Sequence, residues 1–252
     1  MNVLNLKIEI FYWGQKIVLH PSVIQFDNEI FLVDCGYEGS LKLIADQLQN
    51  HGIKITDLSG IVISHDDIDH IGGLYELKDA NPAITVYASE IETPYLTGAV
   101  KSLRLKQAEE LFDMMPPEHR AWAIQFQNEL KAIKRIPVDG ALAFDTSFKE
   151  GVHIINTPGH TPGHISVYFP QNKILIANDA VVVENEELEL ANPEFALDLS
   201  LAIQSVKKLS SLEIDILYCY HGGVVVGDIK NKLMKLLSKY QAVPHPSLAD
   251  RS

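Results

Sequence analysis

The sequence predicts a mixed α/β fold, because segments with the two-residue period of strands alternate with segments at helical spacing in both halves of the chain. The 252 residues are 46% hydrophobic, which suffices for one large domain with a two-sheet core or at most two small domains. No apolar run approaches the roughly 18 residues of a membrane span, so no such span is expected.

The first part of the chain predicts strands around one amphipathic helix. The runs 22–26 and 29–34 flank Asp27-Asn28, a turn pair that predicts a hairpin. Leu41, Ile44, Ala45 and Leu48 recur at helical spacing and predict a helix that ends at Gly52. Alternating or short apolar runs predict strands at 6–12, 22–26, 29–34, 60–64 and 83–88.

Residues from about 90 to 135 break this rhythm and predict a helical insertion, in which Pro116-Pro117 divides two amphipathic helices. It could be a helical hairpin packed on the core, a cap over a functional site or a dimer interface. A few of its apolar side chains could line an acyl pocket, while most are expected to pack between helices. The candidates are Tyr95, Leu96, Phe112, Met114, Met115, Trp122 and Phe126.

Strands resume after the insertion and alternate again with helices. The run "PQN" at 170–172 reads as a turn between two of these strands. The same periodicities predict strands at 152–157, 165–169, 173–177 and 214–220, and helices at 197–210 and 229–240.

Composition narrows the class of partner. A net charge of −12 argues against nucleic acid or an anionic membrane surface as the partner. It leaves small-molecule substrates open, since a bound metal can reverse the local field. Cys35 and Cys219 lie in separate apolar runs and are expected to be buried thiols of a cytoplasmic protein. The first residues do not resemble a signal peptide.

Four segments are unusually rich in metal-binding side chains, and each follows a predicted strand. Because strand ends meet at the rim of a sheet, residues that are distant in sequence can come together there. Imidazole and carboxylate groups are ligands for zinc, iron and manganese. The segments contain His65, Asp67, Asp69 and His70; His160 and His164; Asp179; and His221.

These segments jointly predict a metal site, although each alone has an ordinary explanation. Three carboxylates within the four positions 66–69 of "HDDIDH" would repel one another unless a cation lies among them. His164 is separated from His160 by Thr-Pro-Gly and is expected to support the ligands without binding the metal, or to have a structural role. The remaining histidines lack such context and are expected to be structural or on the surface: His20, His51, His119, His153 and His245.

The ordered motifs "LVDCG", "SHDDIDHIGG", "TPGHTPGHISVY", "ANDA" and "YHGG" resemble the metallo-β-lactamase superfamily from Asp34 to Gly223. The resemblance implies a single domain over 1–252, a four-layered αββα sandwich of two mixed β-sheets flanked by helices, with a helical insertion at about 90–135. It also implies two metal sites. His65, Asp67 and His160 would form one site, Asp69, His70 and His221 the other, Asp179 would bridge both, and Asp34 would support them.

The chain departs from the family pattern His-x-His-x-Asp-His at Asp67, where the second histidine is expected. With two divalent metals, three aspartates and a bridging hydroxide the formal charge is zero, whereas a histidine would leave one positive charge. This predicts a less electrophilic centre that favours iron or manganese over zinc, relative to the usual site. Because aspartate is shorter than histidine, Asp67 could instead leave the first site weak and the protein with one metal.

The sequence therefore predicts a metal-dependent hydrolase whose bridging hydroxide attacks an ester, thioester or lactone carbonyl, with a phosphodiester less favoured. Asp69 is the expected catalytic residue, because it could orient the hydroxide and pass its proton to the leaving group. One alternative is a diiron oxidoreductase that acts on O₂ or NO with a separate electron donor. Another is a non-catalytic metal-binding protein. A homodimer is also compatible with the sequence.

Overall fold

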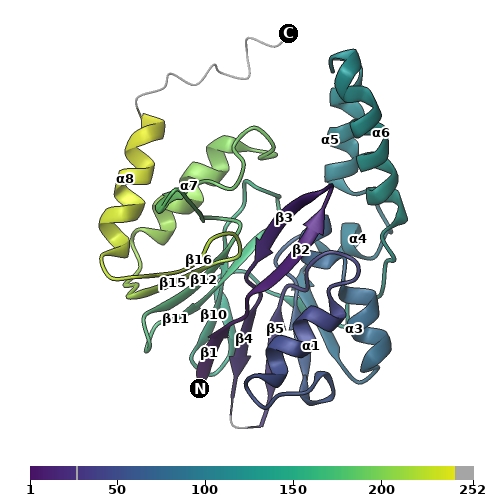
Figure 1. Cartoon of the computed structure of the whole chain (residues 1–252). Helices are drawn as coiled ribbons and strands as arrows, with labels where there is room; N and C mark the ends of the chain where they lie inside the picture. Colours follow the sequence, from purple (N-terminus) through teal and green to yellow (C-terminus); the bar gives the residue numbers. More distant parts are fainter. Residues whose placement is uncertain (27, 242–252) are drawn as a thin grey trace.

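The computed structural model describes residues 1–26 and 28–241 and contains two six-stranded mixed sheets with helices on their outer faces (Figure 1). The first sheet has the order β1 (Asn2–Asn5), β4 (Ser22–Gln25), β5 (Ile30–Val33), β6 (Gly60–Val62), β7 (Thr85–Ser89) and β8 (Gly140–Leu142). The second has the order β16 (Gly223–Val226), β15 (Ile216–Cys219), β12 (Ile174–Asn178), β11 (Ile165–Phe169), β10 (Val152–Asn156) and β9 (Thr146–Lys149).

The alternation of side chains along the central strands separates the layers. In β5, Phe31 and Val33 belong to the cluster shared by both sheets, whereas Leu32 faces the opposite way. In β12, Ile176 joins the shared cluster and Leu175 packs toward the helices. The strands buried on both faces are largely apolar, and the predicted α/β class with two mixed sheets is confirmed.

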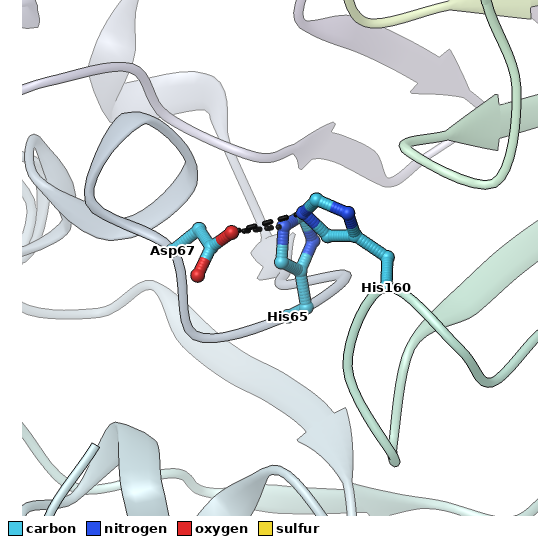
Figure 2. Close-up of side chains that lie close together, drawn as sticks. All are labelled: His65, Asp67 and His160. Carbon is cyan, nitrogen blue, oxygen red and sulfur yellow. Dashed lines mark hydrogen bonds and ion pairs between the residues drawn. The ribbon is translucent and has the colours of Figure 1, made fainter. Parts of the chain in front are cut away.

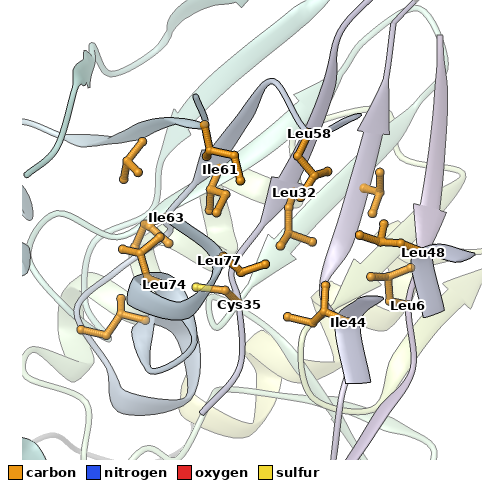
Figure 3. Packing of buried hydrophobic residues seen from close by; sticks show 14 of the residues in the cluster. Leu6, Leu32, Cys35, Ile44, Leu48, Leu58, Ile61, Ile63, Leu74 and Leu77 are labelled. Carbon is orange, nitrogen blue, oxygen red and sulfur yellow. The ribbon is translucent and has the colours of Figure 1, made fainter. Parts of the chain in front are cut away.

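Helices cover the outer face of each sheet. On the first sheet, α1 (Leu41–Gln49) and α3 (Leu74–Ala80) contribute Ile44, Leu48, Leu74 and Leu77 to a cluster with Leu32 and Ile61 (Figure 3). On the second sheet, α7 (Leu199–Leu209) and α8 (Ile229–Gln241) have the corresponding place. Cys35 and Cys219 are buried free thiols, as expected. No helix among the described residues is long and apolar enough to cross a membrane.

The N-terminal region has more strands than the sequence predicted. Of the predicted strand at 6–12, only β2 (Ile8–Tyr12) is formed, and it pairs with β3 (Gln15–Leu19) in a hairpin outside both large sheets. A further small hairpin joins β13 (Val182–Glu184) and β14 (Glu187–Glu189). The predicted hairpin of β4 and β5 is present, with Ser22 opposite Val33, although its turn residue Asp27 lies outside the described residues, as does His245.

The predicted helical insertion is also present and contains α4 (Thr93–Leu96), α5 (Leu103–Phe112) and α6 (Pro117–Ala132). Figure 1 shows α5 and α6 as a helical pair that rises beyond the edge of the sheets, near the tip of the β2–β3 hairpin. The hydroxyl of Tyr12 in β2 donates a hydrogen bond of 2.5 Å to Glu129 of α6, and Trp13 Nε1 donates to the same carboxylate at 3.1 Å. The insertion is thereby joined to the hairpin.

Candidate metal centre

The four predicted segments meet at one rim of the two sheets because each follows a strand. His65 and Asp67 come after β6 and precede the one-turn helix α2 (Ile68–Ile71), which contains the next pair of candidates. His160, Asp179 and His221 follow β10, β12 and β15. Seven candidates form three overlapping groups whose ligand atoms lie within 4.8 Å of one another. These groups are His65, Asp67 and His160; His65, His70 and Asp179; and Asp69, His70 and His221.

Tight turns hold the loops that carry these side chains. Gly159, which precedes His160, has φ +135°, and a Cβ placed there would lie 2.1 Å from the backbone nitrogen of Ala202. Only glycine fits where the backbone approaches so closely in such a conformation. The close approach to α7 fixes the position of His160.

Asp67 Oδ2 is 2.9 Å from His160 Nε2 and 3.5 Å from His65 Nε2, so the carboxylate at the unusual position does face the other two members of its group. Figure 2 shows this carboxylate directed at both imidazoles. Asp179 Oδ2 lies 3.4 Å from His70 Nε2, 3.5 Å from His221 Nε2 and 3.7 Å from His160 Nε2, which places it between the groups.

Several buried polar atoms in this cluster have no hydrogen-bond partner among the described residues. They include His65 Nε2, His70 Nε2 and Asp179 Oδ1. Leaving such atoms unpaired costs free energy. Imidazole nitrogens and carboxylate oxygens are also the donors that divalent zinc, iron or manganese prefer. The residues present therefore fit bound metal ions.

Asp34 controls which nitrogen of the neighbouring imidazoles carries the proton. His70 Nδ1 donates to Asp34 Oδ2 at 2.8 Å, and Ser64 Oγ donates to the same oxygen at 2.6 Å. Because that hydroxyl gives its proton to Asp34, it accepts from His65 Nδ1 at 2.8 Å. In the neutral form of each ring, Nε2 of His65 and His70 is then the unprotonated nitrogen, as a metal ligand requires.

Two arginines from the insertion side balance part of the negative charge. Arg104 of α5 forms a bidentate pair with Asp67, with Nε–Oδ1 at 3.0 Å and Nη2–Oδ2 at 2.6 Å. Arg135 pairs with Asp66. Arginines of the chain itself thus neutralise Asp66 and Asp67, two of the three aspartates for which repulsion within "HDDIDH" was expected. Asp69 contacts imidazoles instead, with His221 Nε2 at 3.1 Å.

The pKa values follow this charge distribution. Burial opposes ionisation of Asp67, but the positive charge of Arg104 outweighs it and holds the pKa of Asp67 well below its usual value. Burial likewise opposes protonation of His221, yet Asp179 and Asp69 raise its pKa to about 10. The cluster therefore keeps its carboxylates ionised and attracts positive charge.

Glu92 connects two of the ligand-bearing loops and was missed by the sequence analysis. Its Oε2 accepts from the backbone N–H of Asp66 at 3.0 Å, and its Oε1 accepts from Thr161 Oγ at 2.6 Å and from the N–H of Gly163 at 2.8 Å. Burial raises the pKa of Glu92 to about 7 despite these bonds. The hydrogen bonds position the loops that carry His65 and His160.

His164 has contacts of a different kind. Its Nδ1 lies 2.8 Å from Thr157 Oγ, and its Nε2 accepts from the backbone N–H of Asp179 at 3.2 Å. Both ring nitrogens are therefore engaged within the fold. This agrees with the structural role expected for it, in which it holds the Asp179 loop.

A cavity of about 400 Å³ opens over the cluster. Trp122 and Phe126 of α6 and Arg104 of α5 line it, so the insertion borders the site. The other five apolar candidates of the insertion are not among its lining residues. Further walls come from Tyr12, Tyr37, Ile68, Val182, Glu184, Ala191, Asn192 and Phe195.

Arg104 had no sequence signal beyond the unusual carboxylate with which it pairs. In "LRLKQAEELF" it occupies a position that reads as part of an exposed polar face, yet it is only 7% exposed. A buried aspartate in place of a histidine does call for a nearby cation. Nothing local indicates which of the chain's arginines or lysines supplies it.

Comparison with known proteins gives consistent matches. The family model described as the metallo-beta-lactamase superfamily matches residues 21–221. The probable metallo-hydrolase YflN of Bacillus subtilis (strain 168) is 29% identical over 230 residues, which cover 86% of this chain and 84% of YflN.

A second sequence match is an N-acyl homoserine lactonase from a Bacillus species, 28% identical over 173 residues, which cover 67% of this chain and 56% of the lactonase. Among solved structures, a metallo-beta-lactamase family protein from Thermus thermophilus superimposes with a TM-score of 0.73 at 20% identity. That alignment covers 95% of this chain and 79% of the other.

Proposed function

Because the chain belongs to the metallo-beta-lactamase superfamily, we propose that it is a metal-dependent hydrolase that cleaves an ester, thioester or lactone. Two divalent ions would be held at the cluster, one by His65, Asp67 and His160 and the other by Asp69, His70 and His221, with Asp179 between them. The main support is that His65 Nε2, His70 Nε2 and Asp179 Oδ1, which have no hydrogen-bond partner among the described residues, converge below the cavity.

Divalent ions, when bound, lower the pKa of water toward about 7 and polarise a carbonyl oxygen. The chain's own contribution begins with Asp69. The imidazoles of His70 and His221 outweigh burial and lower its pKa, so it is a carboxylate at neutral pH. One Asp69 oxygen can accept a proton from the attacking water and return it to the departing oxygen or sulfur.

The cavity favours an apolar acyl substrate over a phosphodiester. Trp122 and Phe126 provide apolar walls. Arg104 is the single Lys or Arg among the described residues that line the cavity, and its nitrogens already have partners within the chain. The lining therefore offers no uncommitted cation for a phosphate. Two of the relatives are an N-acyl homoserine lactonase and a hydroxyacylglutathione hydrolase, and both names refer to acyl compounds.

The proposal is tested by hydrolysis assays on protein loaded with zinc, manganese or iron. The panel contains an activated ester, an acyl thioester, an acyl lactone and a phosphodiester. We expect turnover of at least one carbonyl substrate, and we expect Asp179→Ala to abolish it because that residue would bridge both ions. Asp46→Ala on the exposed face of α1 is the matched control. Absence of turnover for the whole panel, or full activity of Asp179→Ala, would contradict the proposal.

The identity of the two metal ions, a cytoplasmic location and a homodimer are further parts of this proposal. Metal content per chain, measured by mass spectrometry on protein purified without added metal, tests the first. If iron is the dominant metal, the same protein is also assayed for consumption of O₂ or NO in the presence of an electron donor.

A further inference from the structure

Arg104 reaches the metal cluster from the insertion, and four of its N–H groups donate to acceptors there. An arginine has five N–H groups. Besides the two bonds to Asp67, Nη1 donates to Gln107 Oε1 at 2.7 Å and to the carbonyl oxygen of Phe195 at 2.5 Å. Nη2 also lies 3.3 Å from His160 Nε2. The guanidinium is thus held in one orientation by three separate segments of the chain.

This arrangement changes the formal charge expected for the centre. The charge count based on Asp67 alone made the centre neutral where a histidine would leave it with one positive charge. Arg104 is buried beside Asp67 and adds one positive charge to the same volume. The sum returns to the value that a histidine at position 67 would give. Asp67 and Arg104 together therefore match a neutral imidazole in charge.

The pair with Arg104 also orients the shorter aspartate side chain toward the first metal site. An aspartate side chain is shorter than a histidine side chain, and the fork of a guanidinium fixes the plane of a carboxylate through two parallel bonds. With Oδ1 bound to Nε and Oδ2 bound to Nη2, the carboxylate is oriented so that Oδ2 also faces His160 and His65 (Figure 2). Lysine could not do this, because a single ammonium lacks the fixed fork.

We propose that Asp67 and Arg104 form one ligand unit in place of the usual histidine, in which Arg104 is a positioning residue that orients Oδ2 toward the first metal site and cancels the charge of Asp67. This inference rests on the two-metal site of the proposed function. It also makes helix α5 part of the metal centre, since the insertion supplies the cation. Neither residue is expected to work in the role without the other.

A double-mutant cycle tests this dependence. The four proteins are the parent, Asp67→His, Arg104→Gln and the double variant Asp67→His/Arg104→Gln. Zinc per chain is measured by mass spectrometry after dialysis against buffered free zinc, and the affinity of the weaker site is measured by chelator competition. Lys106→Gln, an exposed change on the same helix, is the matched control, and circular dichroism checks that each variant is folded.

The parent should bind two zinc ions. Arg104→Gln should weaken the first site by about 10- to 100-fold, because residues that orient a ligand commonly contribute that much. Asp67→His should weaken it as well, since a buried guanidinium then remains beside the metal without its carboxylate. The double variant should recover two tightly bound ions, because it restores a neutral histidine without the extra cation.

Additive effects, or an Asp67→His protein that binds two ions as tightly as the parent, would overturn the inference. It would also be overturned by a parent with one ion and an Arg104→Gln protein with two, since Arg104 would then exclude the first metal. The result is separable from the proposed function. A cycle that shows recovery in a protein without hydrolytic activity would contradict only the hydrolase, whereas an active enzyme with additive effects would contradict only the ligand unit.

Discussion

The substitution Asp34→Asn probes how the proton positions on His65 and His70 are set. Asp34 is fully buried and accepts three hydrogen bonds, from the Ser64 N–H at 2.8 Å, the Ser64 hydroxyl at 2.6 Å and His70 Nδ1 at 2.8 Å. Asparagine keeps the size but replaces one acceptor oxygen by an NH₂ donor. The substitution should add little backbone strain, because position 34 has φ +59° and asparagine tolerates this left-handed conformation.

Both orientations of the new amide have a cost. If the NH₂ faces the backbone N–H of Ser64, that buried donor is left unpaired, which costs about 1–3 kcal/mol. If the NH₂ takes the place of Oδ2, His70 Nδ1 becomes an acceptor and Ser64 Oγ donates to His65 Nδ1. Both imidazoles then carry their proton on Nε2, which faces the metal site and can no longer bind a metal.

We therefore expect Asp34→Asn to lower metal affinity by about 10- to 100-fold, because binding requires the orientation that leaves Ser64 unpaired. Chelator competition measures the affinity, and urea unfolding with and without metal measures the stability of the same protein. Asp46→Asn, an exposed carboxylate of α1, is the control. An Asp34→Asn protein with unchanged metal affinity would refute the idea that Asp34 sets the tautomers.

Two further predictions concern the loops that carry the ligands. Gly159→Ala should destabilise the protein by roughly 3 kcal/mol or more, because the new Cβ would overlap the backbone of Ala202. Gly151→Ala, at φ +74° with no atom within 4 Å of the new Cβ, should cost only about 1–2 kcal/mol of left-handed backbone strain. Similar unfolding free energies for the two variants would contradict this. In the folded protein the pKa of Glu92 is about 7, whereas an unperturbed glutamate has a pKa of about 4.3. Between these two pH values the folded state binds more protons than the unfolded state, so the free energy of unfolding falls as the pH rises. The difference in unfolding free energy between the parent and Glu92→Gln should therefore change by roughly 3 kcal/mol from pH 4 to pH 8, and an unchanged difference would show that burial does not penalise the Glu92 carboxylate.

The sequence alone determined the features that depend on short-range pattern. Short continuous apolar runs predicted the central strands, because a strand buried on both faces is largely apolar along its whole length. The motifs at 65–70, 160, 179 and 221 each follow a strand, and strand ends converge at a sheet rim. Their convergence could therefore be expected from the sequence alone, and the structure brings all seven metal-ligand candidates together.

The short peripheral strands could not be predicted in the same way. The hairpin of β2 and β3 lies outside both large sheets, and only Ile8 and Leu19 among its strand residues are buried. Its tip is held by contacts such as that of Tyr12 with Glu129, which are 117 positions apart. The same holds for Glu92, whose three hydrogen-bond partners belong to two distant loops.

Tertiary structure alone decided how the carboxylate at position 67 is neutralised. The sequence identified Asp67 as a departure from the family pattern, and its charge count stopped at the residues of the motif. Arg104 is 37 positions away in a helix whose periodicity fits a solvent-facing arginine equally well. The docking of α5 onto the rim brings the guanidinium to Asp67. Docking depends on how complete elements pack against each other, and that information is absent from the local pattern of residues.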